Sequence, residues 1–177
     1  IGAGTASIDI GAVTYTAPSN DLDGNPRPNP AGTVPDMGAY ESDKGVDPDY
    51  AGPVWYVDGP AGLPYGNGGP GAPFTTIQAG IEASSSGDTV SVKAGTYVEN
   101  INYNGKNIAV YGEDQATTII DGNQSGSVVI FELEETAAAM LSGFTITNGG
   151  DVNSGGGIRC TSNSNPTLNN LIVQNNT

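Results

Sequence analysis

The residues best suited to bind a metal ion lie in the segment Asp21-Leu-Asp-Gly-Asn25. Carboxylate and amide oxygens at alternate positions around a glycine can wrap a hard cation such as Ca²⁺. The segment lacks the further spaced ligands and the terminal glutamate of an EF-hand loop, and Asp and Asn in turns commonly bond to their own backbone. The sequence therefore leaves two interpretations of Asp21, Asp23 and Asn25, a structural turn and a Ca²⁺ site, and indicates no other cofactor.

The sequence offers few residues that could catalyse a reaction. There is no histidine, which removes the usual general base and the usual activating partner of a serine or cysteine nucleophile. Hydrolysis would depend on carboxylates, for which Asp121, Asp151 and Arg159 are the available residues. Asp121 lies in an Ile-Asp-Gly corner and Asp151 in a Gly/Asn-rich loop, so neither is expected beside another carboxylate. We predict no catalytic residues and a chain that is not an enzyme, with Cys160 as a buried, inert thiol.

The charge balance narrows the set of partners. Five Lys and Arg residues against nineteen Asp and Glu residues give a net charge of −14, which opposes binding to nucleic acids and to anionic membranes. No stretch approaches the roughly eighteen apolar residues that a membrane span requires. The acidic run of Glu132, Glu134 and Glu135 is expected to be a solvated bulge, with cation binding as the alternative.

An internal repeat gives the strongest indication of the fold. The segment Leu141-Ser-Gly-Phe-Thr-Ile-Thr-Asn148 returns as Leu168-Asn-Asn-Leu-Ile-Val-Gln-Asn175. A repeat of this length is typical of units that bury their apolar faces by stacking on their neighbours. The predicted stacking pairs are Leu141 with Leu168, Phe144 with Leu171, Ile146 with Val173, and Asn148 with Asn175.

Other segments predict strands and one helix. Short apolar runs separated by Gly, Asn, Asp and Ser follow one another from residue 89 to residue 173, as in stacked strands with tight corners. The helical signal lies in residues 74–84, where Ile77 and Ile81 share a face and Thr75 or Thr76 can cap the start. This helix is expected to cover the first strands.

These segments carry a family resemblance. The motifs Phe74-Thr-Thr-Ile-Gln-Ala-Gly-Ile-Glu-Ala83, Gly87-Asp-Thr-Val-Ser-Val92, Ala94-Gly-Thr-Tyr-Val-Glu-Asn-Ile101 and Ile119-Ile-Asp-Gly122 resemble the opening of right-handed parallel β-helix proteins of the pectin-lyase-like superfamily. The resemblance implies an all-β fold, a three-sheet solenoid with a short N-terminal capping α-helix, in a secreted or surface bacterial protein. Residues 1–42 resemble the segment that closes such β-helices at their C-terminal end. The expected division is therefore a closing segment at 1–42, a linker at 43–53 and the start of a parallel β-helix at 54–177.

The expected function follows from this order of segments. We predict a structural module of an extracellular bacterial surface protein, such as an adhesin, a sheath or a filament. If residues 1–42 of one molecule cover residues 166–177 of the next, copies would associate head to tail. The alternative is a carbohydrate- or cation-binding adhesion module, with polysaccharide as a possible partner, and a fragment of a polysaccharide lyase or hydrolase ranks below it. No nucleic-acid partner is expected.

Overall fold

The computed structural model describes residues 7–10, 13–16, 50–59, 62, 66–150 and 155–177. The chain forms two compact units, Ile1–Tyr50 and Ala51–Thr177, which are considered separately. In the first unit, strands β1 (Ser7–Ile10) and β2 (Val13–Thr16) form an antiparallel pair. The candidate metal ligands Asp21, Asp23 and Asn25 lie outside the described residues.

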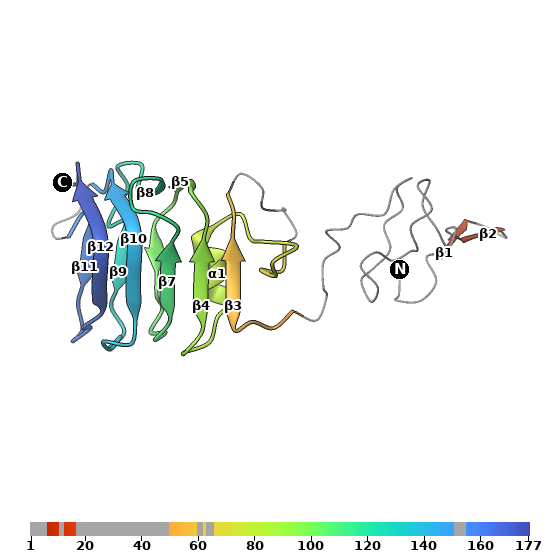
Figure 1. The fold of residues 1–177 in the computed structure, drawn as a ribbon, viewed down its shortest axis with the longest axis horizontal. Helices are drawn as coiled ribbons and strands as arrows, with labels where there is room; N and C mark the ends of the chain where they lie inside the picture. The colour runs from red at the N-terminus through yellow and green to blue at the C-terminus, as the bar shows by residue number, and fades with distance from the viewer. Residues whose placement is uncertain (1–6, 11–12, 17–49, 60–61, 63–65, 151–154) are drawn as a thin grey trace. The chain divides into compact units, whose positions relative to one another are not determined.

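The second unit consists of parallel strands with one helix packed against them (Figure 1). Its elements in chain order are β3 (Val54–Val57), α1 (Ile77–Ala83), β4 (Thr89–Val92), β5 (Gly95–Val98), β6 (Ile101–Asn102), β7 (Ala109–Gly112), β8 (Thr118–Asp121), β9 (Val129–Phe131), β10 (Met140–Thr147), β11 (Ile158–Cys160) and β12 (Thr167–Gln174). One seven-stranded sheet has the order β3-β4-β7-β10-β8-β5, with β12 also paired to β10. Strands β6, β9 and β11 form a separate three-stranded sheet.

The prediction of an all-β solenoid with three sheets is wrong. The second unit has two sheets and a helix, because strands expected in two separate sheets belong to a single sheet. Strand β10 pairs with β7 through Met140–Ser142 and with β8 through Thr145–Thr147. This long strand joins two rows of short strands into a single seven-stranded parallel sheet, which is accompanied by a three-stranded sheet and a helix.

Glycine allows β10 to continue between its two sets of partners. Gly143 has a φ of +83°, in the left-handed region that side chains disfavour. A Cβ atom on Gly143 would lie 2.4 Å from the carbonyl oxygen of Gly112, at the end of β7. The close approach of these two backbones therefore excludes any side chain at residue 143.

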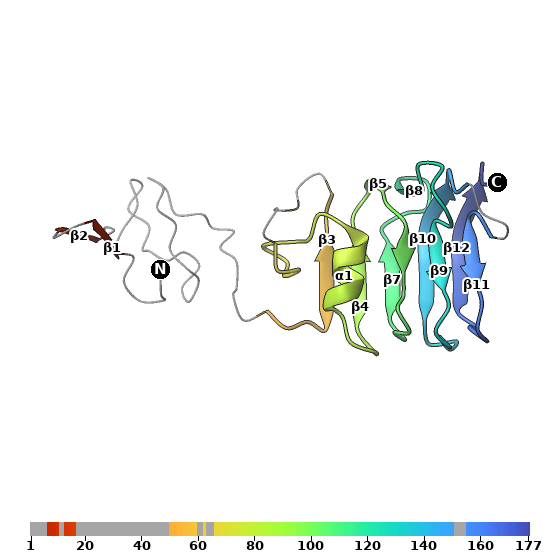
Figure 2. The same ribbon diagram turned by 180° about the vertical axis from the view of Figure 1, so that it is seen from behind.

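Helix α1 lies within the segment predicted to be helical and packs beside β3 and β4 (Figure 2). The Thr76 hydroxyl accepts a hydrogen bond from the Ala79 N–H and caps the first turn. Ile77 and Ile81 are fully buried. A Cβ atom on Gly80 would lie 2.7 Å from a methyl group of Val90, so this glycine allows the helix to approach the sheet closely.

The core lies between the inward faces of the two sheets. The rings of Tyr103 and Phe131 have centroids 4.2 Å apart, and both side chains are fully buried. The Tyr103 hydroxyl donates to the carbonyl oxygen of Met140 at 2.7 Å, so the one polar atom of this ring is satisfied. Other fully buried apolar side chains are those of Ile101, Ile108, Val110, Ile120, Val128, Val129, Leu141, Phe144 and Ile146.

Candidate functional site

The predicted stacking residues lie on the neighbouring strands β10 and β12. The structure pairs Leu141 with Leu168, Phe144 with Leu171, and Ile146 with Val173 in parallel register. Asn148 and Asn175 each follow the end of their strand, and both have a left-handed φ, of 56° and 54°. The repeat in the sequence therefore corresponds to two adjacent strands of one sheet.

The two strands differ in how far their apolar side chains are buried. Leu141 and Ile146 on β10 have no exposed surface, whereas Leu168 is 43% exposed and Val173 is 52% exposed. Within the described residues β12 pairs only with β10, so its other side has no strand beside it. A shallow hollow on this side is lined by Ile158, Leu168, Asn169, Asn170, Leu171 and Val173. We call β11 and β12, with these lining residues, the open edge.

The opposite end of the seven-stranded sheet is covered. On β3, the Tyr56 N–H donates to the Gly68 carbonyl at 2.8 Å, and the Tyr56 carbonyl accepts from the Phe74 N–H at 2.9 Å. The rings of Trp55 and Phe74 stack with centroids 6.2 Å apart. The second unit thus has one covered end, at β3, and one open edge, at β11 and β12 (Figure 1).

A row of polar side chains crosses the three-stranded sheet and ends at the open edge. The Asn102 side chain donates to one oxygen of Glu132 at 2.9 Å, and Nη2 of Arg159 donates to the other at 2.5 Å. Nε of Arg159 is buried and has no acceptor among the residues that the structure describes. Because Arg159 lies on β11, this row of polar contacts ends at the open edge with an ion pair between Arg159 and Glu132.

Glu135 is fully buried, although the sequence predicted that it would be solvated like the rest of its acidic run. Its carboxylate accepts from the Gly105 N–H at 2.9 Å, the Leu133 N–H at 3.0 Å and the Ser164 hydroxyl at 2.6 Å. Burial acts to raise the pKa of Glu135, but the hydrogen bonds, that from Ser164 first, outweigh it and hold the pKa below its usual value. The ionised carboxylate therefore joins three successive turns, including the turn that leads into β12.

Glu99 has the opposite electrostatic environment. Its carboxylate accepts from the backbone N–H groups of Ile77 and Gln78, at 2.8 and 3.0 Å, and so satisfies donors in the first turn of α1. Burial raises the pKa of Glu99 more than these two hydrogen bonds lower it. The residue fixes the helix against the strands that follow it.

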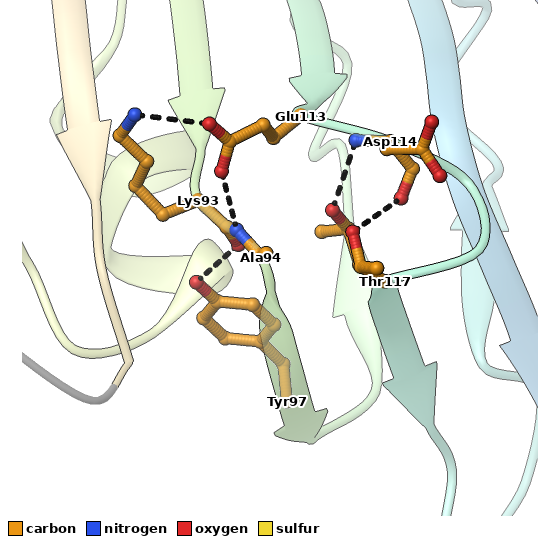
Figure 3. Close-up of polar contacts among 7 residues, drawn as sticks. Lys93, Ala94, Tyr97, Glu113, Asp114 and Thr117 are labelled. Carbon is orange, nitrogen blue, oxygen red and sulfur yellow. Dashed lines mark hydrogen bonds and ion pairs between the residues drawn. The ribbon is translucent and has the colours of Figure 1, made fainter.

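A carboxylate also joins two turns in the corner shown in Figure 3. One oxygen of Glu113 lies 3.2 Å from Nζ of Lys93, and the other accepts from the Ala94 N–H at 3.1 Å. The hydrogen bond from Ala94, followed by the Lys93 contact, lowers the pKa of Glu113. The Tyr97 hydroxyl donates to the Lys93 carbonyl at 2.9 Å. Glu113 is therefore occupied in holding the end of β4 beside the end of β7.

The residues considered for catalysis are occupied in the same way. Asp121 accepts from the Asn123 N–H at 2.8 Å and from the Asn148 side chain at 2.9 Å, which joins two consecutive turns. Arg159 pairs with Glu132, and Asp151 lies outside the described residues. Among the residues with described positions, no group of three His, Cys, Asp or Glu side chains could hold a metal ion.

Two features differ from the sequence-based expectation or were missed by it. Cys160 is exposed on β11 rather than buried, although desolvation and the charge of Glu135 raise the pKa of its thiol.

Asn176, next to the predicted Asn175, accepts from the Gly149 N–H at 2.8 Å and donates to the Ile146 carbonyl at 3.1 Å. The alignment of Asn175-Asn176 with Asn148-Gly149 was the only signal in the sequence for this contact.

Comparisons with known proteins add no relative. No protein-family model, no curated protein and no solved structure matches the chain. The resemblance to pectin-lyase-like proteins stays a prediction. In the part of the chain that the structure describes, no helix has the length and apolar character needed to cross a membrane.

Proposed function

We propose that this chain is a non-enzymatic structural module of an extracellular surface protein, and that it joins copies of itself through the open edge. The observation that carries the proposal is that the apolar side chains of β12 are more exposed than those of β10. Side chains that are buried on β10 have equivalents on β12 that are about half exposed, as Ile146 and Val173 illustrate. An unpaired strand with exposed apolar side chains is a ready template for another strand.

The gain from covering the open edge is modest. Fully burying a leucine or valine side chain contributes about 1.5–3 kcal/mol, so completing the burial of Leu168, Leu171 and Val173 would contribute roughly 3 kcal/mol in all. New backbone hydrogen bonds along β12 would add to this, and the loss of translational and rotational freedom would oppose it. We therefore expect weak association, at concentrations near the millimolar range, rather than a permanent dimer.

The charge of the chain does not prevent this contact. The whole chain has a net charge of −14, but residues 155–177 contain a single charged side chain, that of Arg159. The remaining side chains in this stretch are apolar or are neutral Asn, Ser, Thr and Gln. The open edge therefore avoids the repulsion that two acidic surfaces would experience at close range.

The use of the carboxylates also supports a structural role. Glu99, Glu113, Asp121 and Glu135 each accept from a backbone N–H group of a turn or of the helix. A general acid or base needs a proton-exchanging oxygen directed at a substrate. These four carboxylates instead satisfy backbone donors that connect consecutive strands.

Self-association can be tested by light scattering and sedimentation over a range of concentrations. We expect the mass of the wild-type chain to rise above the monomer mass of 17.9 kDa, and Val173→Asp to remain monomeric. The matched control is Val98→Asp, because Val98 is 64% exposed but lies on β5, away from the open edge. A wild-type chain that stays monomeric at millimolar concentration contradicts the proposal, as does equal association of the two variants.

A further inference from the structure

The turn between β6 and β7 contains a dipeptide that can react with itself, Asn104-Gly105. Asparagine is a thermolabile residue, and a following glycine carries no side chain to hinder attack by its amide nitrogen. The nitrogen of Gly105 forms a bond to Cγ of Asn104, and the bond from Cγ to the side-chain nitrogen breaks. Ammonia leaves with the proton of the Gly105 amide. Water then opens the succinimide ring, at Cγ to give aspartate or at the main-chain carbonyl carbon to give isoaspartate.

The side chain of Asn104 is available for this reaction. Asn104 is exposed, and its side-chain amide makes no hydrogen bond to the residues that the structure describes. Asn104 and Gly105 both have a left-handed φ, of 52° and 76°, and form the tip of a tight turn. Nothing in this part of the turn therefore keeps Cγ of Asn104 away from the nitrogen that follows it.

The amide of Gly105 is held by a buried carboxylate. Its N–H donates to Glu135 at 2.9 Å, and Glu135 has no exposed surface. Attack on Asn104 requires the Gly105 nitrogen to lose its proton, and the negative charge that results is disfavoured beside an ionised carboxylate. The nitrogen must also turn away from Glu135, which breaks a hydrogen bond to a charged group. The contact with Glu135 therefore opposes both requirements of the reaction.

The chain has two other Asn-Gly pairs, at Asn67 and Asn148, and their side chains are restrained. The side-chain nitrogen of Asn148 donates to Asp121 at 2.9 Å, and the Gly149 N–H has an acceptor as well. The side-chain oxygen of Asn67 accepts a backbone hydrogen bond at 3.0 Å. Asn104 differs from both, because its reactivity is opposed on the glycine side alone.

We propose that Asn104 is a latent modification site, which converts to aspartate and isoaspartate when Glu135 releases the amide of Gly105. The site lies in the turn between β6 and β7, away from the open edge, and is independent of the proposed self-association.

The modification would alter a turn on which helix α1 depends. The Lys106 N–H donates to the Tyr103 carbonyl at 3.0 Å and closes the turn around residues 104 and 105. The Lys106 ammonium group donates to three carbonyl oxygens at the end of α1, at 2.7, 2.8 and 2.7 Å. Isoaspartate adds a backbone atom to this turn, so it would displace Lys106 from the end of the helix.

Peptide mass spectrometry of the full chain, incubated at neutral pH, tests the proposal. Trypsin cleaves after Lys93 and Lys106 and so places Asn104 and Asn148 in different peptides, and chromatography separates the aspartate and isoaspartate products. We expect Asn104 to convert roughly tenfold or more slowly in the native chain than in guanidinium chloride, because the native chain must first break the bond to Glu135. Equal rates in the two solutions would overturn the proposal.

The variant Glu135→Gln assigns the protection to the carboxylate. In the folded variant we expect Asn104 to convert about tenfold faster than in wild type, while Asn148 keeps its wild-type rate. The matched control is Glu134→Gln, which removes the neighbouring, exposed charge and should leave both rates unchanged. A wild-type rate at Asn104 in Glu135→Gln chains with a native circular dichroism spectrum would refute the role of Glu135.

Hydrogen exchange of the wild-type chain decides the matter if Glu135→Gln does not fold, a case that faster conversion of Asn148 as well as Asn104 reveals. We expect the Gly105 amide to exchange roughly tenfold or more slowly than an unprotected amide, since its N–H is bonded to a buried acceptor. Exchange of the native Gly105 amide at the rate of an unprotected amide would overturn the proposal.

Discussion

The substitution Glu135→Gln tests whether a buried carboxylate holds the turns of this protein together. Glutamine has nearly the same shape, but it offers one acceptor oxygen and replaces the other with an NH₂ group. One oxygen of Glu135 accepts from Gly105, and the other accepts from Leu133 and Ser164. The amide oxygen of the introduced glutamine can take the place of the oxygen that accepts from Leu133 and Ser164. The NH₂ group then faces the Gly105 N–H, which loses its acceptor.

The magnitude follows from these contacts. A hydrogen bond to a charged group contributes about 1.5–3 kcal/mol, and the corresponding neutral bond contributes about 1 kcal/mol. Losing one bond and weakening two others is therefore expected to lower the free energy of unfolding by about 2–4 kcal/mol at pH 7.

The effect must also depend on pH. The pKa of Glu135 in the folded state lies below the usual value of 4.5. Its stabilising contribution is therefore complete above the pKa of the unfolded chain and is lost as the pH falls through the folded-state pKa. The difference between wild type and Glu135→Gln should be largest at neutral pH and should shrink as the solution becomes more acidic than pH 4.5.

Urea denaturation at low protein concentration, followed by the fluorescence of Trp55, measures this difference. The control is Glu134→Gln, which alters the exposed neighbouring glutamate and should change the free energy of unfolding by less than about 0.5 kcal/mol. The reasoning is refuted if Glu135→Gln behaves like this control, or if its effect is the same at pH 7 and at strongly acidic pH.

Three further substitutions test other contacts by urea denaturation. Gly143→Ala should lower the free energy of unfolding by about 2 kcal/mol more than Gly87→Ala. Both glycines have a positive φ, but only at Gly143 would the added methyl group lie within 2.4 Å of backbone. Equal effects of the two substitutions would contradict the close approach at β10. Glu99 has a raised pKa, so its contribution is complete below the unfolded-state pKa and is lost as the pH rises through the folded-state pKa. Glu99→Gln should therefore gain stability relative to wild type between pH 4 and pH 7, the reverse of the trend for Glu135, and a flat difference would contradict this. Tyr103→Phe should cost about 1 kcal/mol through the loss of one buried hydrogen bond, and no measurable cost would argue against that bond.

Some of the fold could be predicted because it is encoded locally. Thr76, Ile77 and Ile81 provide a cap and an apolar face within one short segment, and the helix forms there. The pairing of Leu141 with Leu168 is visible as a repeat, since the same side chains return at the same positions along the neighbouring strand. Both predictions depended on residues close in sequence or on direct similarity between two segments.

The other pairings carry no such signal. Val110 pairs with Val90 on one side and with Leu141 on the other, and the lengths of the intervening segments differ. Turns of variable length hide the periodicity of the strands. For the same reason the sequence did not show that β10 would extend past Gly143 and pair with both β7 and β8.

The sequence by itself determined the strand-rich, acidic character of the chain, the position of the helix and the register of its last two long strands. Only the tertiary structure decided that two rows of strands form one sheet, that Glu135 is buried while Cys160 is exposed, and that β12 presents apolar side chains without a neighbouring strand. The physical reason is that a residue type fixes which contacts are favourable, whereas burial and hydrogen-bond partners depend on which distant segments the turns bring together. Glu132, Glu134 and Glu135 illustrate this, because three glutamates in one short run become an ion-pair partner, an exposed side chain and a buried acceptor.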